Sequence, residues 1–253
     1  MKITIQRWLL PLLVIAVIAI AGCDNSSATS SSSTPSPVAS ESVSPSPVTQ
    51  ASNSQLANLP RLEGKATVVM VVKGSPITIE VDGTNAPITA GNFVDLVKRG
   101  VYDGLKFHRV IREPQPFVAQ GGDPQGKDPK FPVARLGTGG FIDPVTSKER
   151  YIPLEIKPKS AKEPIYSMTL EQAGVNVQPV LKHTRGAIAM ARANPPDSAS
   201  SQFYFALSDL PFLDGSYAVF GYVTQGMEIV DKIEQNDRID SAKVTQGLEN
   251  LKS

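Results

Sequence analysis

From residue 59 onward the chain is a series of short apolar runs separated by turn-forming residues. The runs are rich in β-branched or aromatic side chains and span residues 66–72, 105–111, 117–120, 187–191, 202–207 and 218–223. Runs of this length between Gly, Pro and Asp are typical of β-strands. Many short strands with frequent turns favour a closed β-barrel.

Two helices are also expected. Residues 90–99 place apolar side chains on one helical face, Thr89 precedes them, and Gly100 stands where a left-handed C-cap is favoured. Residues 227–234 show a weaker helical spacing. The predicted fold is therefore mainly β, a closed barrel capped by two α-helices.

The N-terminal residues 1–22 have the pattern of a secretory signal. Lys2 and Arg7 precede an uncharged apolar run, and Ala21-Gly22 forms a small-residue cleavage site. Cys23, the only cysteine, follows directly and resembles the lipidated cysteine of a bacterial lipobox. We therefore expect an exported protein anchored to a membrane by lipid on Cys23, the alternative being an incidental cysteine within a plain signal peptide.

Residues 23–58 are dominated by Ser, Pro, Thr and Ala and contain no aromatic residue. Such a stretch cannot bury enough apolar area to offset the entropy of ordering it, so it is predicted to be a linker. The folded domain is expected over 59–253. Its residues 141–180, rich in Pro, Lys and Glu, are interpreted as an inserted surface excursion.

The charge of the chain argues against a nucleic-acid surface. The formal net charge is +1, and removal of Lys2 and Arg7 with the signal leaves 25 − 2 = 23 basic against 24 acidic residues. A near-neutral domain lacks the basic excess that phosphate binding requires. A monomer is the simplest expectation, and no cofactor is implied.

Several short motifs of the folded part resemble, in order, those of the cyclophilins, which are peptidyl-prolyl cis-trans isomerases. The motifs are Tyr102-Asp103-Gly104, Phe107-His108-Arg109-Val110, Gln120-Gly121-Gly122-Asp123-Pro124, Gly137-Thr138-Gly139-Gly140, Lys182-His183-Thr184, Ala189-Met190-Ala191, Ser201-Gln202-Phe203, Leu213-Asp214-Gly215 and Val219-Phe220-Gly221. The resemblance covers roughly residues 66–235. It implies an eight-stranded antiparallel barrel with two helices.

The chemistry of such an enzyme needs one fixed cation. Rotation about an X-Pro bond has a barrier of about 20 kcal/mol because the amide loses its conjugation. The proline nitrogen regains a lone pair as the bond twists, so a nearby guanidinium stabilises the twisted state more than either planar isomer. Arg109 of the Phe-His-Arg motif is the predicted catalytic residue, the alternative being a surface arginine paired with an acid.

The resemblance also implies a substrate-binding set around Arg109. It consists of His108, Phe117, Val118, Gln120, Ala191, Arg192, Ala193, Gln202, Tyr204, Phe212, Leu213 and Tyr217. Gln120 would bind the substrate backbone, and the apolar members would line a proline pocket. Without the motifs, ordinary core packing would be the favoured interpretation of those apolar residues.

The chain departs from the usual family pattern at several of these positions. Residues 112–116 lengthen the loop before Phe117, and Phe212 and Tyr217 replace a Trp and a His, so cyclosporin should bind weakly. Arg192 and Val118 replace Asn and Met. Tyr204 replaces Phe, and its added hydroxyl needs a hydrogen-bond partner.

Other chemistries are disfavoured. His108 and His183 lie in separate motifs with no third ligand at metal spacing, and Ser201 lacks the context of a nucleophile. Two functions remain open at this point. One is an exported prolyl isomerase that assists protein folding outside the cytoplasm. The other is a binding module or chaperone that recognises proline-containing segments, or assists assembly of a membrane complex, without catalysis.

Overall fold

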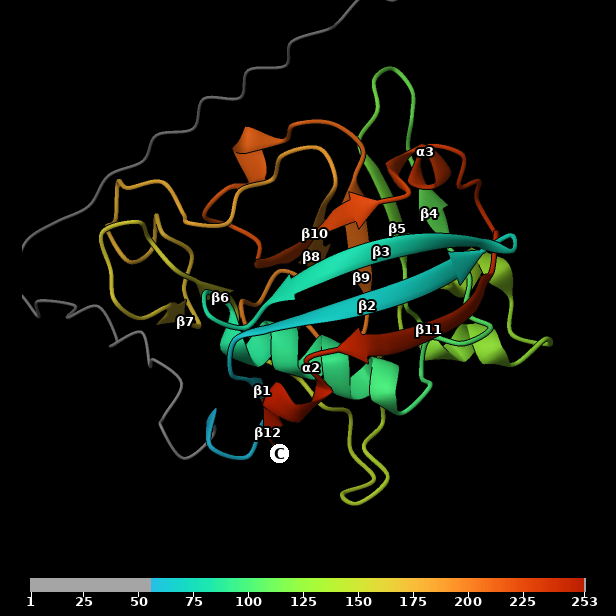
Figure 1. The fold of residues 1–253 in the computed structure, drawn as a ribbon, viewed down its shortest axis with the longest axis horizontal. Coiled ribbons are helices and arrows are strands. Elements are labelled where there is room, and N and C mark those ends of the chain that lie inside the picture. The colour runs from blue at the N-terminus through green and yellow to red at the C-terminus, as the bar shows by residue number, and fades with distance from the viewer. Residues whose placement is uncertain (1–55, 253) are drawn as a thin grey trace, which may run out of the picture. The chain divides into compact units, whose positions relative to one another are not determined.

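A computed structural model describes residues 56–252, so the signal, Cys23 and most of the predicted linker lie outside the described residues. One antiparallel eight-stranded sheet dominates this part (Figure 1). Its strands, in spatial order, are β11 (Ile239–Gln246), β2 (Lys65–Val72), β3 (Ser75–Asp82), β10 (Val219–Gln225), β8 (Ala187–Met190), β9 (Phe203–Ala206), β5 (Val118–Gly121) and β4 (Arg109–Val110). The eight strands are confirmed.

The predicted closure of the barrel is overstated. No strand ladder joins β4 to β11; a bridge between Lys106 and Arg238 and single backbone bonds, such as Phe107 N–H to Asp237 O at 2.9 Å, span the gap. The predicted strand over 105–111 is correspondingly wrong in length, since only Arg109–Val110 forms a ladder. The chain before β4 meets β11 through irregular contacts, so the sheet is a strongly curled half-barrel.

Two α-helices are present in the described part of the chain. α2 (Pro87–Lys98) lies against one side of the curled sheet, and α3 (Met227–Val230) is a single turn on another side (Figure 1). The predicted start at Thr89 is wrong: Pro87 opens the helix, because its fixed φ suits the first turn and its missing N–H costs nothing there. Gly100 does follow the helix with φ of 65°.

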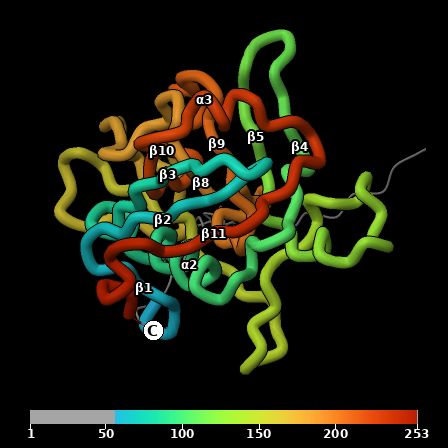
Figure 2. The backbone as a smooth tube through the Cα atoms, turned by 45° about the vertical axis from the view of Figure 1, so that its right-hand side comes forward, coloured from blue at the N-terminus to red at the C-terminus, as the bar shows by residue number. Residues whose placement is uncertain are grey.

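Smaller elements complete the described chain. They are the strand pairs β1 (Arg61–Leu62) with β12 (Leu251–Lys252) and β6 (Glu155–Ile156) with β7 (Ile165–Tyr166), and the 3-10 turns η1 (Pro124–Lys127), η2 (Val133–Arg135), η3 (Pro211–Leu213) and η4 (Leu248–Asn250). Figure 2 shows two loops that project from the body, one between β4 and β5 and one between η2 and β6. Over 56–252, no helix has the length and apolar character that a bilayer span needs.

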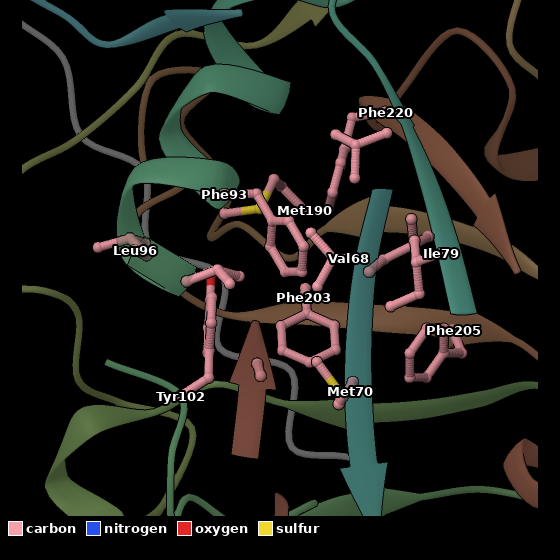
Figure 3. Packing of buried hydrophobic residues seen from close by; sticks show 14 of the residues in the cluster. Val68, Met70, Ile79, Phe93, Leu96, Tyr102, Met190, Phe203, Phe205 and Phe220 are labelled. Atoms are coloured by element: carbon pink, nitrogen blue, oxygen red, sulfur yellow. The ribbon is translucent and has the colours of Figure 1, made fainter. Parts of the chain in front are cut away.

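The core is an aromatic cluster between α2 and the sheet. Phe93 of α2 lies within 5.6 Å, centroid to centroid, of Tyr102, Phe203 and Phe220 (Figure 3). The strand β2 alternates buried and partly exposed residues, as a strand with one face on a core must. The aromatic cluster is therefore fully buried between α2 and the sheet.

Residues 141–180 are more than a surface excursion. Leu154, Ile156 and Leu170 form a small buried cluster with Ala218, the residue just before β10. Glu155, within this predicted surface excursion, is only 1 % exposed, and its carboxylate accepts the N–H groups of Ile88 and Thr89 at 3.0 and 2.7 Å. The segment therefore supplies the N-cap that Ala86 cannot give to α2.

Candidate active site

One pocket of about 170 Å³ gathers most of the predicted site residues. Its lining comes from β4, β5 and β9, from the residue just before β5, from the loop after β8, and from η3 and the loop after it. It consists of Arg109, Phe117, Val118, Gln120, Ala191, Arg192, Tyr204, Leu213 and Tyr217. Tyr204 and Val118 are buried on neighbouring strands, and Phe117 and Leu213 are partly exposed. The buried part of the lining is thus apolar, and two guanidiniums, those of Arg109 and Arg192, belong to the pocket wall.

A chain of hydrogen bonds positions the guanidinium of Arg109. Arg109 and Gln120 face each other across β4 and β5, and Arg109 Nη1 donates to Gln120 Oε1 at 3.2 Å. Gln120 Nε2 donates to Gln202 Oε1 at 3.1 Å, and Gln202 Nε2 donates to Gly139 O at 2.8 Å. Each amide is oriented by the next, so Arg109, although exposed, has a defined direction.

The far end of this chain is fixed by Asp123. This buried carboxylate accepts the N–H groups of Gly137, Thr138 and Gly139 at 2.6 to 3.1 Å through one oxygen. A Cβ at position 139 would lie 2.6 Å from the other oxygen of Asp123, so only glycine fits there without a shift. The Gly-Thr-Gly-Gly motif is therefore required for close backbone approach.

A second cavity, of about 460 Å³, adjoins the first and shares Gln120, Ala191 and Arg192 with it. The predicted residues Ala193 and Gln202 lie here. The remaining lining was not predicted to belong to the site and consists of Gly137, Thr138, Gly139, Glu149, Tyr151, Pro195, Asp197, Ser198 and Ser200. Of these residues, only Gly137, Thr138 and Gly139 belong to a motif that the sequence showed. The remaining ones are brought to the cavity by the fold, so no signal in the sequence marked them.

Aromatic contacts define the rim of the pocket. The Arg109 guanidinium carbon lies 5.6 Å from the centre of the Phe117 ring, and Phe117 stacks on Phe212 at 6.0 Å. On the other side, the guanidinium carbon of Arg192 lies 4.7 Å from the ring centre of Tyr217. These contacts restrict the aromatic side chains without filling the pocket.

Two predicted residues lie outside both cavities. Phe212 is 68 % exposed on η3, where it touches Phe117 only from outside. His108 is buried against the glycine loop, since a Cβ at position 137 would lie 3.2 Å from its Nε2 atom. Burial lowers the pKa of His108, with Arg109 adding to this effect and Asp123 opposing it.

Behind the pocket lies a group of polar residues whose joint role the sequence did not predict. The Tyr204 hydroxyl lies 2.9 Å from His183 Nε2, which meets the expectation that it needs a partner. His183 Nδ1 lies 2.9 Å from Asp214 Oδ1. Burial raises the pKa of Tyr204 and lowers that of His183, although Asp214 opposes the second change.

Comparison with known proteins agrees with this geometry. Residues 67–250 match the family model described as cyclophilin type peptidyl-prolyl cis-trans isomerase/CLD. A putative thylakoid lumen peptidyl-prolyl cis-trans isomerase of Synechocystis is 46 % identical over 207 residues, covering 78 % of this chain and 51 % of that protein. The chloroplastic isomerase CYP38 of Arabidopsis thaliana is 42 % identical over 212 residues, covering 77 % and 45 %.

A solved structure shows the same fold. The cyclophilin type isomerase of Cryptosporidium parvum has a TM-score of 0.53 and 25 % identity, over 72 % of this chain and 98 % of that one. The chain therefore belongs to the cyclophilin-type peptidyl-prolyl cis-trans isomerase family. It spans about half the length of the Synechocystis and Arabidopsis relatives.

Proposed function

We propose that the chain catalyses cis-trans isomerisation of X-Pro bonds in polypeptides. The observation that carries this proposal is the Arg109 guanidinium, oriented by Gln120 at the wall of an apolar pocket. The pocket takes the prolyl ring, and Arg109 donates a hydrogen bond to the proline nitrogen only when the bond is twisted. The cation thus lowers the barrier more than it strengthens binding.

Gln120 has a second role in this proposal. One N–H of its side-chain amide donates to Gln202, and an amide nitrogen carries two. The other N–H can donate to a substrate carbonyl and hold the residue before the proline while the prolyl side rotates. No nucleophile and no proton transfer take part.

The test is the isomerisation rate of an X-Pro peptide, measured by NMR exchange. Arg109→Ala should lower kcat/KM by about 10²–10³, the usual loss for one donor aimed at the transition state. Arg238→Ala, which removes an exposed arginine outside both cavities, is the matched control and should leave the rate unchanged. A folded wild-type protein that binds the peptide but does not accelerate exchange would instead support a non-catalytic binding module.

We also propose that the protein is exported and held at a membrane by lipid on Cys23, and that its clients are proteins outside the cytoplasm. The basic start, apolar run and Ala21-Gly22 before Cys23 support this, as do the relatives named for the thylakoid lumen and the chloroplast. Two acyl chains on one residue would hold the protein stably, whereas a single chain would not.

Cell fractionation tests the anchor. Cys23→Ser should move the protein from the membrane pellet to the soluble fraction, whereas Ser26→Ala, a change in the same stretch, should not. Continued pelleting of Cys23→Ser would rule out the lipid on Cys23.

A further inference from the structure

The three residues behind the proline pocket have only one consistent arrangement of protons. Asp214 Oδ1 accepts the backbone N–H of His183 at 2.8 Å, and a carboxylate has no proton to give, so His183 Nδ1 also donates to it. In the neutral imidazole Nε2 is then an acceptor. Tyr204 must therefore donate its hydroxyl proton to Nε2, 2.9 Å away.

This arrangement of protons matters because Tyr204 belongs both to the proline pocket and to the polar group behind it. Its side chain lines the proline pocket, and the same side chain carries the hydroxyl that bonds to His183. His183 is 2 % exposed and Tyr204 is 5 % exposed, so water is not available as a substitute partner for either group. The hydroxyl proton is therefore held away from the space that the prolyl ring enters.

We propose that His183, held by Asp214, is a positioning residue that keeps the hydroxyl proton of Tyr204 out of the proline pocket, so that protonation of His183 weakens the binding of prolyl peptides. This inference rests on the proposed prolyl-peptide function. A protonated His183 donates from both ring nitrogens, and Nε2–H then donates to the tyrosine oxygen. The tyrosine proton has to turn elsewhere, which places an unpaired donor beside the apolar pocket.

The surrounding charges agree with this switch. Asp214 is the anion that faces His183. Tyr222 of β10 uses its hydroxyl in hydrogen bonds with the backbone of Lys182, the residue that precedes His183 in the chain. Tyr217 and Arg192 lie on the pocket side of Tyr204. Burial raises the pKa of Tyr204, so the hydroxyl keeps its proton, and lowers the pKa of His183, so protonation of this imidazole needs a more acidic solution than that of a free histidine.

The first test compares pH profiles of the whole chain and its Tyr204→Phe variant by NMR exchange on an X-Pro peptide. Between pH 8 and pH 5 the wild type should lose about fivefold in kcat/KM, the equivalent of one neutral hydrogen bond, mainly through KM. The variant should not show this loss, because it has no hydroxyl proton to turn. His108 is present in both proteins, so its titration cancels from the comparison. Equal pH profiles would overturn the proposal.

The second test needs no turnover. The ¹⁵N shifts of the His183 ring at pH 8 should show a protonated Nδ1 and an unprotonated Nε2, and the opposite tautomer would overturn the proposal. Binding of the same peptide, followed by chemical shifts, should weaken about fivefold on acidification in the wild type alone. A protein that binds with this pH dependence but does not accelerate exchange would refute the enzymatic function and leave the inference intact.

Discussion

Arg109 owes its position to its neighbours across the sheet. It lies on a two-residue strand and is exposed, so packing alone does not fix its side chain. Three successive hydrogen bonds, through Gln120 and Gln202 to the backbone of Gly139, supply that constraint. The residue types were apparent in the motifs, but their connection was not, because these residues lie far apart in the sequence.

This chain of amides gives a prediction at the residue scale. Gln202→Ala removes the acceptor that orients Gln120, so Arg109 loses its fixed direction and kcat/KM should fall about three- to tenfold. The rate is measured by NMR exchange, as for Arg109→Ala. Because Gln202 acts through Arg109, adding Gln202→Ala to Arg109→Ala should cause little further loss. Additive losses would show that Gln202 acts independently of the arginine.

At the scale of elements, α2 depends on a residue distant in the sequence. Its N-cap, Ala86, has no side-chain oxygen, and Glu155 of β6 takes that place. The negative carboxylate also lies at the positive end of the helix dipole. The segment 141–180 therefore stabilises the helix that covers the sheet, a role that its Pro-, Lys- and Glu-rich composition did not indicate.

Glu155→Ala should lower the free energy of unfolding by about 1–3 kcal/mol, because two buried N–H groups lose their acceptor. Denaturant unfolding measures this change. Glu163→Ala removes an exposed carboxylate from the same segment and should have almost no effect. If the two variants unfold at the same denaturant concentration, Glu155 is not the cap.

Glu155 also predicts a pH dependence of stability. Burial raises its pKa in the folded protein, and the N–H donors oppose that rise only in part. The folded state then binds more protons than the unfolded state between the two pKa values, so stability is lost as the pH rises through the raised value. Relative to Glu155→Gln, which cannot titrate, the wild type should be most stable below about pH 4. A pH-independent difference between the two proteins would contradict this assignment.

At the scale of the whole molecule, the aromatic core joins α2 to the strands that carry the site. Phe93 of α2 contacts Phe203, which lies between the site residues Gln202 and Tyr204 along the chain. Successive side chains of a strand point to opposite faces, so β9 presents Phe203 to the core and Tyr204 to the pocket. The strand that lines the pocket is thus packed on its other face against the core.

Phe93→Ala should lower the free energy of unfolding by about 3–5 kcal/mol, since it leaves a cavity in a fully buried cluster. Val145→Ala, at a position 88 % exposed, is the control and should change it by less than about 0.5 kcal/mol. Thermal and denaturant unfolding provide the comparison. A small effect of Phe93→Ala would mean that α2 is not essential to the core.

Local patterns in the sequence determined much of the architecture. The short β-rich runs and Gly100 depend on neighbouring residues only, so they predicted most strands and the end of α2. The resemblance carried by the motifs, and not the local pattern, implied the site residues, most of which lie together in the lining of one pocket. The strand β11 was missed because its polar and charged residues mask the period.

Only the tertiary structure decided the features that join distant segments. They are the incomplete closure between β4 and β11, the cap that Glu155 gives to α2, and the Tyr204, His183 and Asp214 group behind the pocket. Each depends on a hydrogen bond, or a missing ladder, between residues brought together by folding. Such contacts leave no periodic trace in a sequence, because the pattern of each segment is set by its own burial and not by its partner.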